Sequence, residues 1–472
     1  MAQTSRTMPF FSCSLPFFSL VFLLQALQIS SSSPTPITIP LSFSSTDSYA
    51  DLYQKLSHLA SASLARAHHI KNPQLSSTAF TSTTPLLPHS YGGYSISLSF
   101  GTPPQTISLV MDTGSGFLWF PCTKKYLCKN CSFPGARGIT SFSPKQSSSI
   151  KIVGCLNKKC GWIHPNFDPQ TSCGECQSLS AKNCTQICPP YVILYGSGST
   201  GGIAIVETLD LPNKKVPNFL VGCSLFSSRQ PAGIAGFGRG PASLPSQLGL
   251  KKFSYCLLSR RFDDTGESGF LVLDGDSNSG KKTENFSYTP LAKNPIVAGK
   301  SALQVYYYVG LRKISVGMQK VKIPYNYLVP DSDGNGGTIV DSGSTFTIMS
   351  SPVFEVVAGE FIKQVKLYRR AENIESLTGL RPCFNLSGHD SIVLPELKFS
   401  FKGGAEMKLP LANYFSLVGG NEVLCLTMVT DNIGPALTTG PSIILGSFQM
   451  QNYNVEYDLL NERFGFRQQS CK

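Results

Sequence analysis

The chain has 472 residues, of which 41% are hydrophobic and 14% are charged, so it can bury a large core and is not intrinsically disordered. Its 42 Gly and 32 Pro favour an all-β protein with many short strands and turns. The net charge of +12 would suit an anionic partner, but no more than two basic residues are adjacent. No basic block is therefore available to follow a phosphate backbone, and we expect no nucleic-acid partner.

The first thirty residues predict a secretory signal peptide, 1–30. An apolar stretch from Leu15 to Leu27 follows Arg6, and small residues follow at 30–33, which is the layout of a cleaved signal. A membrane anchor is the alternative, but the uninterrupted apolar run is short for a membrane span. We find no later apolar run of that length and no hydrophobic tail for a lipid anchor. We therefore expect a secreted protein without a membrane anchor.

The next segment, 31–88, is rich in Ser, Thr and Pro apart from a helical pattern near 51–71. The apolar stripe of that helix consists of Leu52, Leu56, Leu59 and Leu64. From Tyr94 onward the pattern changes to the alternation that is typical of strands. A leader followed by a sharp onset of strand pattern predicts a propeptide at 31–88, and a disordered N-terminal tail is the alternative.

The cysteines indicate disulfides. Removing Cys13 with the signal leaves 14 of the 15 Cys, and an even, locally dense set is typical of a disulfide-bonded secreted chain. Ten of them lie from Cys122 to Cys223 and are expected to pair among themselves. A zinc site would need the Cys-x-x-Cys pairs at 128–131 and 173–176, but 41 residues separate these pairs, too many for a common zinc module.

The last four cysteines are expected to form two bridges, Cys256–Cys471 and Cys383–Cys425. Cys383 and Cys425 stand beside strand-like stretches, while Cys256 and Cys471 stand at the two ends of one lobe, and the termini of a compact unit often lie close together. Glycosylation sequons at Asn285 and Asn385, with a weaker one at Asn183, agree with secretion.

An internal repeat gives the main functional signal. The segment Leu-Val-Met-Asp-Thr-Gly-Ser at 109–115 recurs as Thr-Ile-Val-Asp-Ser-Gly-Ser at 338–344. In each copy a short apolar strand delivers an Asp into a tight turn, and an apolar strand ending in Gly follows, at 233–236 and 443–446. The repeat predicts two similar lobes with a site on the axis between them.

We expect these lobes to span 89–250 and 251–472. One helix is expected in the second lobe from Ser351-Pro352, because Ser favours the N-cap and Pro the first turn. The face of this helix that is expected to be apolar consists of Val353, Val357, Phe361 and Val365.

The two repeated aspartates, Asp112 and Asp341, are the candidate catalytic pair. Two carboxylates held close together share one proton, so that one acts as a base and the other as an acid on the same water. The flanking residues are expected to support the pair: the glycines allow tight turns, the last serines hydrogen-bond the outer carboxylate oxygens, and the middle hydroxyls tie the loops together. These supporting residues are Thr113, Gly114, Ser115, Ser342, Gly343 and Ser344.

The two loops resemble the active-site loops of the pepsin-like aspartic proteases. Trp119 stands where that family has the Trp that meets the flap tyrosine. The segment Tyr195-Gly196-Ser197-Gly198 resembles the flap hairpin, with Tyr195 closing over the substrate. The Cys-rich stretch before the flap resembles the insertion of the plant nepenthesin-like branch. Ser342 departs from the archetype, which has Thr, but still supplies a hydroxyl.

The resemblance implies a bilobal all-β fold with a few short helices and pseudo-two-fold symmetry. It implies a secreted aspartic endopeptidase, extracellular, in the cell wall or in the vacuole, that acts at acid pH on a polypeptide substrate as a monomer. No metal or organic cofactor is implied. The alternative is a catalytically inactive pepsin-like binding protein such as a glycosidase inhibitor. Both aspartates, both glycines and the flap tyrosine are retained, which favours the enzyme.

Overall fold

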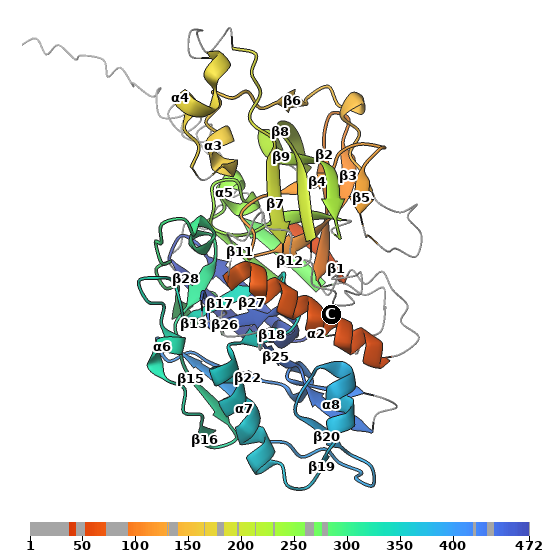
Figure 1. Ribbon diagram of the computed structural model, residues 1–472, viewed down its shortest axis with the longest axis vertical. Helices are drawn as coiled ribbons and strands as arrows, with labels where there is room; N and C mark the ends of the chain where they lie inside the picture. The colour runs from red at the N-terminus through yellow and green to blue at the C-terminus, as the bar shows by residue number, and fades with distance from the viewer. Residues whose placement is uncertain are drawn as a thin grey trace, which may run out of the picture. The chain divides into compact units, whose positions relative to one another are not determined.

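The computed structural model in Figure 1 describes most of the chain from residue 37 onward. The described residues are 37–43, 52–71, 93–129, 131, 140–164, 166–176, 184–195, 198–212, 214–229, 232–259, 269–275, 282–418, 422–431 and 439–471. The expected signal peptide, Asn183, Gly196 and Ser197 lie outside them. Among the described residues, no helix is both long and apolar enough to cross a membrane.

Strands dominate the structure, so the expected all-β fold with a few short helices is confirmed. The helices are α2 (Leu52–Lys71), α3 (Cys160–Ile163), α4 (Pro169–Ser172), α5 (Leu244–Leu248), α6 (Tyr325–Leu328), α7 (Ser351–Gln364) and α8 (Glu372–Thr378). The short 3-10 turns are η1 (Pro144–Gln146), η2 (Gly174–Cys176), η3 (Ser301–Gln304), η4 (Leu411–Asn413) and η5 (Ser447–Met450).

One large sheet joins the N-terminal lobe to strands from the end of the chain. Its strands are β1 (Ile37–Phe43), β2 (Tyr94–Phe100), β3 (Gln105–Asp112), β4 (Trp119–Pro121), β5 (Leu127–Lys129), β6 (Lys151–Ile152), β7 (Tyr191–Tyr195), β8 (Gly198–Leu211), β9 (Lys214–Ser228), β10 (Gly233–Gly236), β11 (Lys252–Cys256), β12 (Gly269–Asp274), β13 (Ser287–Pro290), β27 (Tyr453–Asp458) and β28 (Arg463–Gln468). Their order is β13-β28-β27-β11-β12-β1-β2-β3-β10-β4-β9-β8-β6, while β5 pairs with β9 and β7 with β8.

Three smaller sheets build the C-terminal lobe. The first, in the order β14-β17-β26-β18-β25, carries the second half of the site. Its strands are β14 (Tyr307–Val309), β17 (Thr338–Asp341), β18 (Thr347–Met349), β25 (Met428–Thr430) and β26 (Ile443–Gly446). The second sheet has the strand order β16 (Gln319–Lys320), β15 (Leu311–Val316), β21 (Leu397–Phe401) and β22 (Glu406–Leu409). The third has the order β19 (Arg369–Arg370), β20 (Cys383–Asn385), β24 (Val423–Leu426) and β23 (Phe415–Val418).

The repeat in the sequence is a repeat in the fold. In the N-terminal lobe β10 pairs parallel with β3 and antiparallel with β4, and in the C-terminal lobe β26 pairs parallel with β17 and antiparallel with β18. The register sets Asp112 opposite Gly236 and Asp341 opposite Gly446. Each Asp therefore ends a central strand at the same point of an equivalent three-strand unit.

Buried aromatic rings fix these units against each other. Phe253 stacks on Tyr457 with ring centroids 4.5 Å apart, and Tyr307 meets Tyr457 edge-on at 4.6 Å. Tyr307 also donates a hydrogen bond of 2.8 Å to the Phe237 carbonyl just past β10. Because Tyr307 belongs to β14 and the other rings to the large sheet, this cluster holds the two carboxylate-bearing strands in a fixed relation.

The leader contributes two elements. The expected helix is α2, whose Leu56 and Leu59 are buried in an apolar cluster with residues of β18 and α8, and Figure 1 shows α2 lying across the strands β18 and β25. The strand β1 was not foreseen in the sequence. It fills the place between β12 and β2, pairing antiparallel with both.

Helix α7 starts where the sequence indicates, and Val353, Val357 and Phe361 are buried on its inner face. Its N-cap is Ser350 and not Ser351, and the Ser350 side chain makes no cap hydrogen bond. The Ser351 N–H instead donates to the Asp431 carboxylate at 3.0 Å.

All described cysteines are paired in the structure. Cys256 is bonded to Cys471 and Cys383 to Cys425, which are the two pairs that the sequence analysis expected. The ten cysteines of the N-terminal lobe form five bridges among themselves. These are Cys122–Cys223, Cys128–Cys131, Cys155–Cys173, Cys160–Cys188 and Cys176–Cys184.

Candidate active site

Asp112 and Asp341 face each other in the interior, with only 2% and 0% of their surfaces exposed. In each loop the last serine donates its hydroxyl hydrogen bond to the outer oxygen Oδ2, at 2.6 Å for Ser344 and Asp341 and in the same way for Ser115 and Asp112. The Gly114 and Gly343 N–H groups donate to the Oδ1 atoms of their own aspartates at 2.9 and 3.0 Å. Each carboxylate is therefore held at both oxygens by its own loop.

The two loops are tied together by a reciprocal set of hydrogen bonds. The Thr113 N–H donates to Ser342 Oγ at 3.1 Å, and the Ser342 N–H donates to Thr113 Oγ1 at 2.9 Å. Each hydroxyl then donates to a carbonyl of the opposite strand, at Val340 and Met111. Ser342 thus supplies the hydroxyl that the archetypal Thr would supply, and the pair is locked across the lobes.

The loop glycines are required for a reason other than the expected one. Neither Gly114 nor Gly343 has a positive φ. A Cβ at Gly114 would lie 2.6 Å from Asp341 Oδ1, and a Cβ at Gly343 would lie 2.5 Å from Asp112 Oδ1. Glycine is therefore needed so that the carboxylate of the opposite lobe can approach, and not to permit the turn.

The flap residues lie above this pair. The Trp119 Nε1–H donates a 2.6 Å hydrogen bond to the Tyr195 hydroxyl, and both side chains are buried. Tyr195 pairs with Gly198 at the end of the antiparallel strands β7 and β8, which places Tyr195 at the tip of the described part of this hairpin.

Arg66 of the leader helix occupies the centre of the site, and the sequence analysis missed it. Its Nη2 lies 2.7 and 2.9 Å from the two oxygens of Asp112, and its Nε lies 3.1 Å from Asp341 Oδ2. Nη2 is also 3.5 Å from Asp341 Oδ1, so one guanidinium bridges both carboxylates. The signal in the sequence is an Arg on the buried stripe of α2, three residues after buried Ser63 and four before buried Ile70.

The surroundings separate the two carboxyl groups electrostatically. Burial, with a further contribution from the neighbouring Asp341, raises the pKa of Asp112 to about 6 against the opposing charge of Arg66. Burial also acts to raise the pKa of Asp341, but Arg66 and the hydrogen bond from Ser344 outweigh it and leave that pKa below its usual value. One carboxyl therefore holds a proton in mild acid while the other stays ionised, which is the arrangement an acid–base pair needs.

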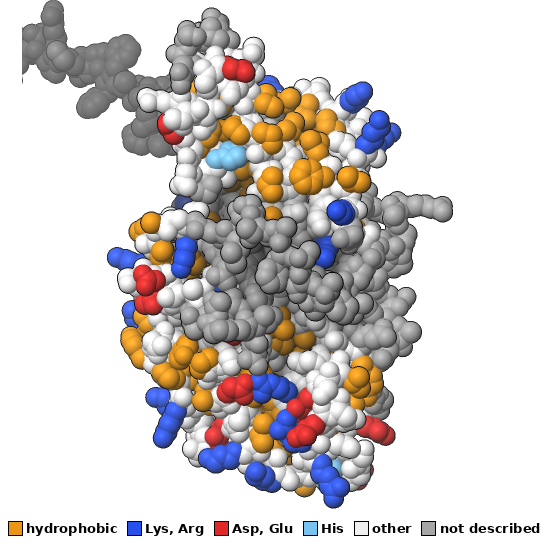
Figure 2. Space-filling view, in the orientation of Figure 1, with side chains coloured by type: hydrophobic (Ala, Val, Ile, Leu, Met, Phe, Trp, Pro, Cys, Tyr) orange, Lys and Arg blue, Asp and Glu red, His pale blue; other side chains and the backbone are white. Residues whose placement is uncertain are grey.

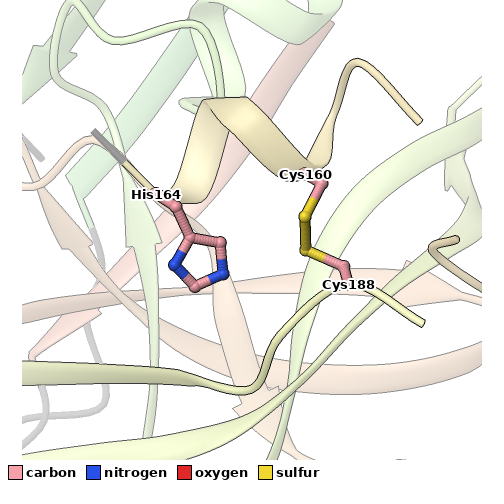
Figure 3. Close-up of side chains that lie close together, drawn as sticks. All are labelled: Cys160, His164 and Cys188. Carbon is pink, nitrogen blue, oxygen red and sulfur yellow. A yellow bond between two sulfur atoms is a disulfide. The ribbon is translucent and has the colours of Figure 1, made fainter. Parts of the chain in front are cut away.

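Three potential metal ligands lie together in the described part of the N-terminal lobe, but they do not form a metal site. Cys160, His164 and Cys188 lie together (Figure 3), but the two cysteines are joined by a disulfide. Their thiolates are therefore not available to a metal. His164 Nε2 lies 3.0 Å from the Pro189 carbonyl oxygen, so the imidazole is accounted for as part of the packed insertion.

Two of the three expected glycosylation residues lie on the surface. Asn285 and Asn385 are exposed, and Asn385 Oδ1 accepts a hydrogen bond from the Ser387 N–H at 2.8 Å.

Comparisons with known proteins agree with this geometry. Family models described as "Xylanase inhibitor N-terminal" and "Xylanase inhibitor C-terminal" match residues 94–275 and 306–468. A probable aspartyl protease of Arabidopsis thaliana is 32% identical over 434 residues, covering 82% of this chain and 84% of that protein. The aspartic proteinase nepenthesin-1 of Nepenthes gracilis is 32% identical over 387 residues, covering 80% and 78%.

Solved structures support the fold. Basic 7S globulin from soybean superposes with a TM-score of 0.56 at 19% identity, covering 81% of this chain and 93% of that chain. Conglutin gamma from lupine seeds gives 0.58 at 19% identity, covering 93% and 96%. With the two matched lobes, the paired aspartates and the relatives at 32% identity, the chain belongs to the plant branch of the pepsin-like aspartic protease family.

Proposed function

We propose that the chain is an aspartic endopeptidase that cleaves peptide bonds at acid pH and is made as an inactive precursor. The observation that carries this proposal is the buried pair Asp112 and Asp341. A serine of each loop hydrogen-bonds its own aspartate, and reciprocal hydrogen bonds between Thr113 and Ser342 join the two loops. A binding protein has no need for two desolvated carboxylates at this position, because burying charge is costly even when it is paired.

In the active form the inner Oδ1 atoms of the pair hold a water where Arg66 Nη2 now lies. The ionised carboxylate takes a proton from this water while the oxygen of the water attacks the peptide carbonyl carbon. The protonated carboxyl donates its proton to the carbonyl oxygen, which gives a neutral tetrahedral intermediate. The carboxyl that took the water's proton passes it to the peptide nitrogen, while the other carboxylate takes a proton from one hydroxyl of the intermediate. The C–N bond then breaks, which gives a carboxylic acid and an amine and restores one proton to the pair. Tyr195 covers the cleft and excludes other water.

The leader accounts for the inactive state. Arg66 fills the position of the water and neutralises the pair, and α2 covers the apolar surface that includes Phe346 and Ile348 beside the second loop. Substrate and Arg66 exclude each other. We therefore infer that residues 31–88 act as a propeptide that must leave before catalysis, and that acid favours this step by protonating carboxylates that hold the leader.

We also propose that the protein is secreted, to the extracellular space, the cell wall or the vacuole, and works as a monomer without a nucleic-acid partner. The exposed sequon residues Asn285 and Asn385 and the seven disulfides are compatible with secretion. On the face seen in Figure 2, Lys and Arg side chains are scattered among acidic ones and form no continuous stripe.

The second candidate is an inactive inhibitor of a glycan-degrading enzyme, because both matching family models carry the name of a xylanase inhibitor. One experiment separates the two. The purified full chain is brought to acid pH with a denatured protein substrate, with and without pepstatin, and in parallel with a xylanase. The endopeptidase predicts cleavage that pepstatin blocks and that Asp341→Asn lacks. Loss of xylanase activity without any proteolysis would favour the inhibitor.

A further inference from the structure

A second charged residue of the leader helix is buried in the C-terminal lobe. Lys71, the last residue of α2, forms an ion pair through Nζ with Asp431 Oδ2, and the two residues are only 2% and 5% exposed. The Lys71 carbonyl also accepts a hydrogen bond of 3.3 Å from Thr439 Oγ1. Lys71 is therefore inserted into the lobe, and its ammonium group fills a site whose charged wall is Asp431.

The fold, and not the leader, holds Asp431 in place. Its other oxygen, Oδ1, accepts a hydrogen bond of 3.0 Å from the Ser351 N–H at the start of α7, a position where a helix stabilises negative charge. Its N–H donates to the Met349 carbonyl. Removing the leader takes away the partner of Oδ2 and leaves the support of Oδ1 unchanged.

The helix α2 links the catalytic pair to Asp431. Arg66, which lies on the pair, and Lys71 are five residues apart in this helix, which is about 7.5 Å along its axis and about 140° around it. The two side chains leave the helix in different directions, so the two sites are separated by more than the axial rise, and an extended peptide advances about 3.3 Å per residue. A side chain within a few residues of the cleaved bond would therefore reach Asp431 when the bond itself lies on the two aspartates.

The departure of the leader leaves Asp431 with an unpaired, poorly solvated oxygen. Removing one partner of a buried ion pair costs far more than the pair contributes, because the remaining charge is uncompensated. A cation that takes the place of the Lys71 ammonium group restores an ion pair with Asp431. We propose that Asp431 forms a specificity subsite that selects a Lys or Arg side chain of the polypeptide substrate within a few residues of the cleaved bond. The inference rests on the proposed endopeptidase function.

The competing explanation is that Asp431 serves only to cap α7 and to hold the leader. It predicts that Asp431→Asn leaves substrate preference unchanged, because an Asn side-chain oxygen still accepts from the Ser351 N–H. The subsite predicts a change in preference that depends on charge. The two explanations therefore differ in one measurable quantity, which is the ratio of kcat/KM for basic and neutral side chains at one substrate position.

The test uses the full chain after acid activation and a set of quenched fluorescent peptides. Lys, Arg, Gln, norleucine and acetyl-lysine are placed in turn at each position on either side of the cleaved bond. At one position we expect kcat/KM for Lys and Arg to exceed that for Gln and acetyl-lysine about ten-fold, and Asp431→Asn to remove this ratio. Asp390→Asn is the matched control, because it removes the same charge from an exposed aspartate of the lobe.

The outcomes distinguish failure of the proposed subsite from failure of the proposed endopeptidase function. If the wild type cleaves the peptides with no basic preference, or if Asp431→Asn retains the preference, the subsite is refuted and the endopeptidase stands. If no peptide is cleaved at all, both fail. Should Asp431→Asn not fold, as judged by thermal melting, the comparison of Lys with acetyl-lysine in the wild type decides the matter, because acetylation removes the charge while the enzyme is unchanged.

Discussion

Replacing Arg66 by Gln should release the leader at neutral pH, so that the precursor is active as soon as it meets acid and needs no activation step. The substitution keeps a polar end at the position of Nε, shortens the side chain, and removes the charge that bridges Asp112 and Asp341 at 2.7 and 3.1 Å. Arg66 is almost completely buried, at 9% exposure, so solvent does not compensate for its loss. We therefore expect the docked state of the leader, and not the fold of the lobes, to be destabilised.

The size of the effect follows from burial. Removing one partner of a buried ion pair costs about 3–5 kcal/mol, which corresponds to roughly two to three and a half orders of magnitude in the equilibrium between docked and released leader. The expected effect is largest near neutral pH. In mild acid it shrinks, because the pKa of Asp112 is raised to about 6 and protonation removes part of the unpaired charge.

The assay holds wild type, Arg66→Gln and Arg66→Lys as full-length chains at pH 7 and then shifts them to acid pH, where activity is read at once, before the wild type has activated. Cleavage of a quenched peptide reports activity, and gel electrophoresis follows loss of the leader. Arg66→Gln should be active from the start, and Arg66→Lys should lie between, since a single ammonium cannot make the forked contact. Arg312→Gln, at an exposed arginine of the C-terminal lobe, is the control. An Arg66→Gln precursor that stays as silent as the wild type would refute the assignment of Arg66 as the inhibitory contact.

The remaining predictions concern the pair and the flap. Asp112→Asn and Asp341→Asn should each abolish peptidase activity with melting temperatures that still show a folded protein; near-normal hydrolysis by either variant, free of wild-type contamination, would contradict the shared-proton mechanism. The rate of the activated enzyme should fall towards neutral pH, because the protonated carboxyl of the pair then loses the proton it must donate; burial raises the pKa of Asp112 in the precursor, and a rate that keeps rising through pH 7 to 8 would exclude the mechanism. Tyr195→Phe should lower kcat/KM about ten-fold and the unfolding free energy by about 1–3 kcal/mol, because the buried Trp119 N–H loses its acceptor; unchanged kinetics and stability would show that the contact has no role.

The loops of the site could be predicted from sequence because their chemistry is local. Each Asp-hydroxyl-Gly-hydroxyl run contains the groups that hold its own carboxylate, and its duplication implied that the two runs meet. The roles expected for Thr113, Ser342, Ser115 and Ser344 all correspond to hydrogen bonds in the structure. The glycines were expected at the right positions for the wrong reason, since no local pattern reveals a carboxylate that approaches from the other lobe.

The contacts of the leader could not be predicted from sequence, because its partners are distant along the chain. Arg66 meets Asp341 across 275 residues and Lys71 meets Asp431 across 360. The strand β1 forms because an open place exists between β12 and β2, a property of the assembled sheet and not of the segment 37–43. Composition rich in Ser, Thr and Pro suggested a loose segment, and tertiary pairing overrides that propensity.

The two strand units that carry the aspartates are nearly equivalent, so the difference between the two carboxylates comes from the leader. Gly236 and Gly446 occupy equivalent places, and at each a Cβ would lie within 2.6 Å of the backbone of Phe117 or Phe346, both five residues past the aspartate. Two such equivalent units present two nearly equivalent carboxylates. The Arg66 guanidinium breaks this equivalence, because it grips both oxygens of Asp112 from Nη2 but meets Asp341 mainly through Nε. In the proposed mechanism, the water and the substrate determine which carboxyl holds the shared proton once the leader has left.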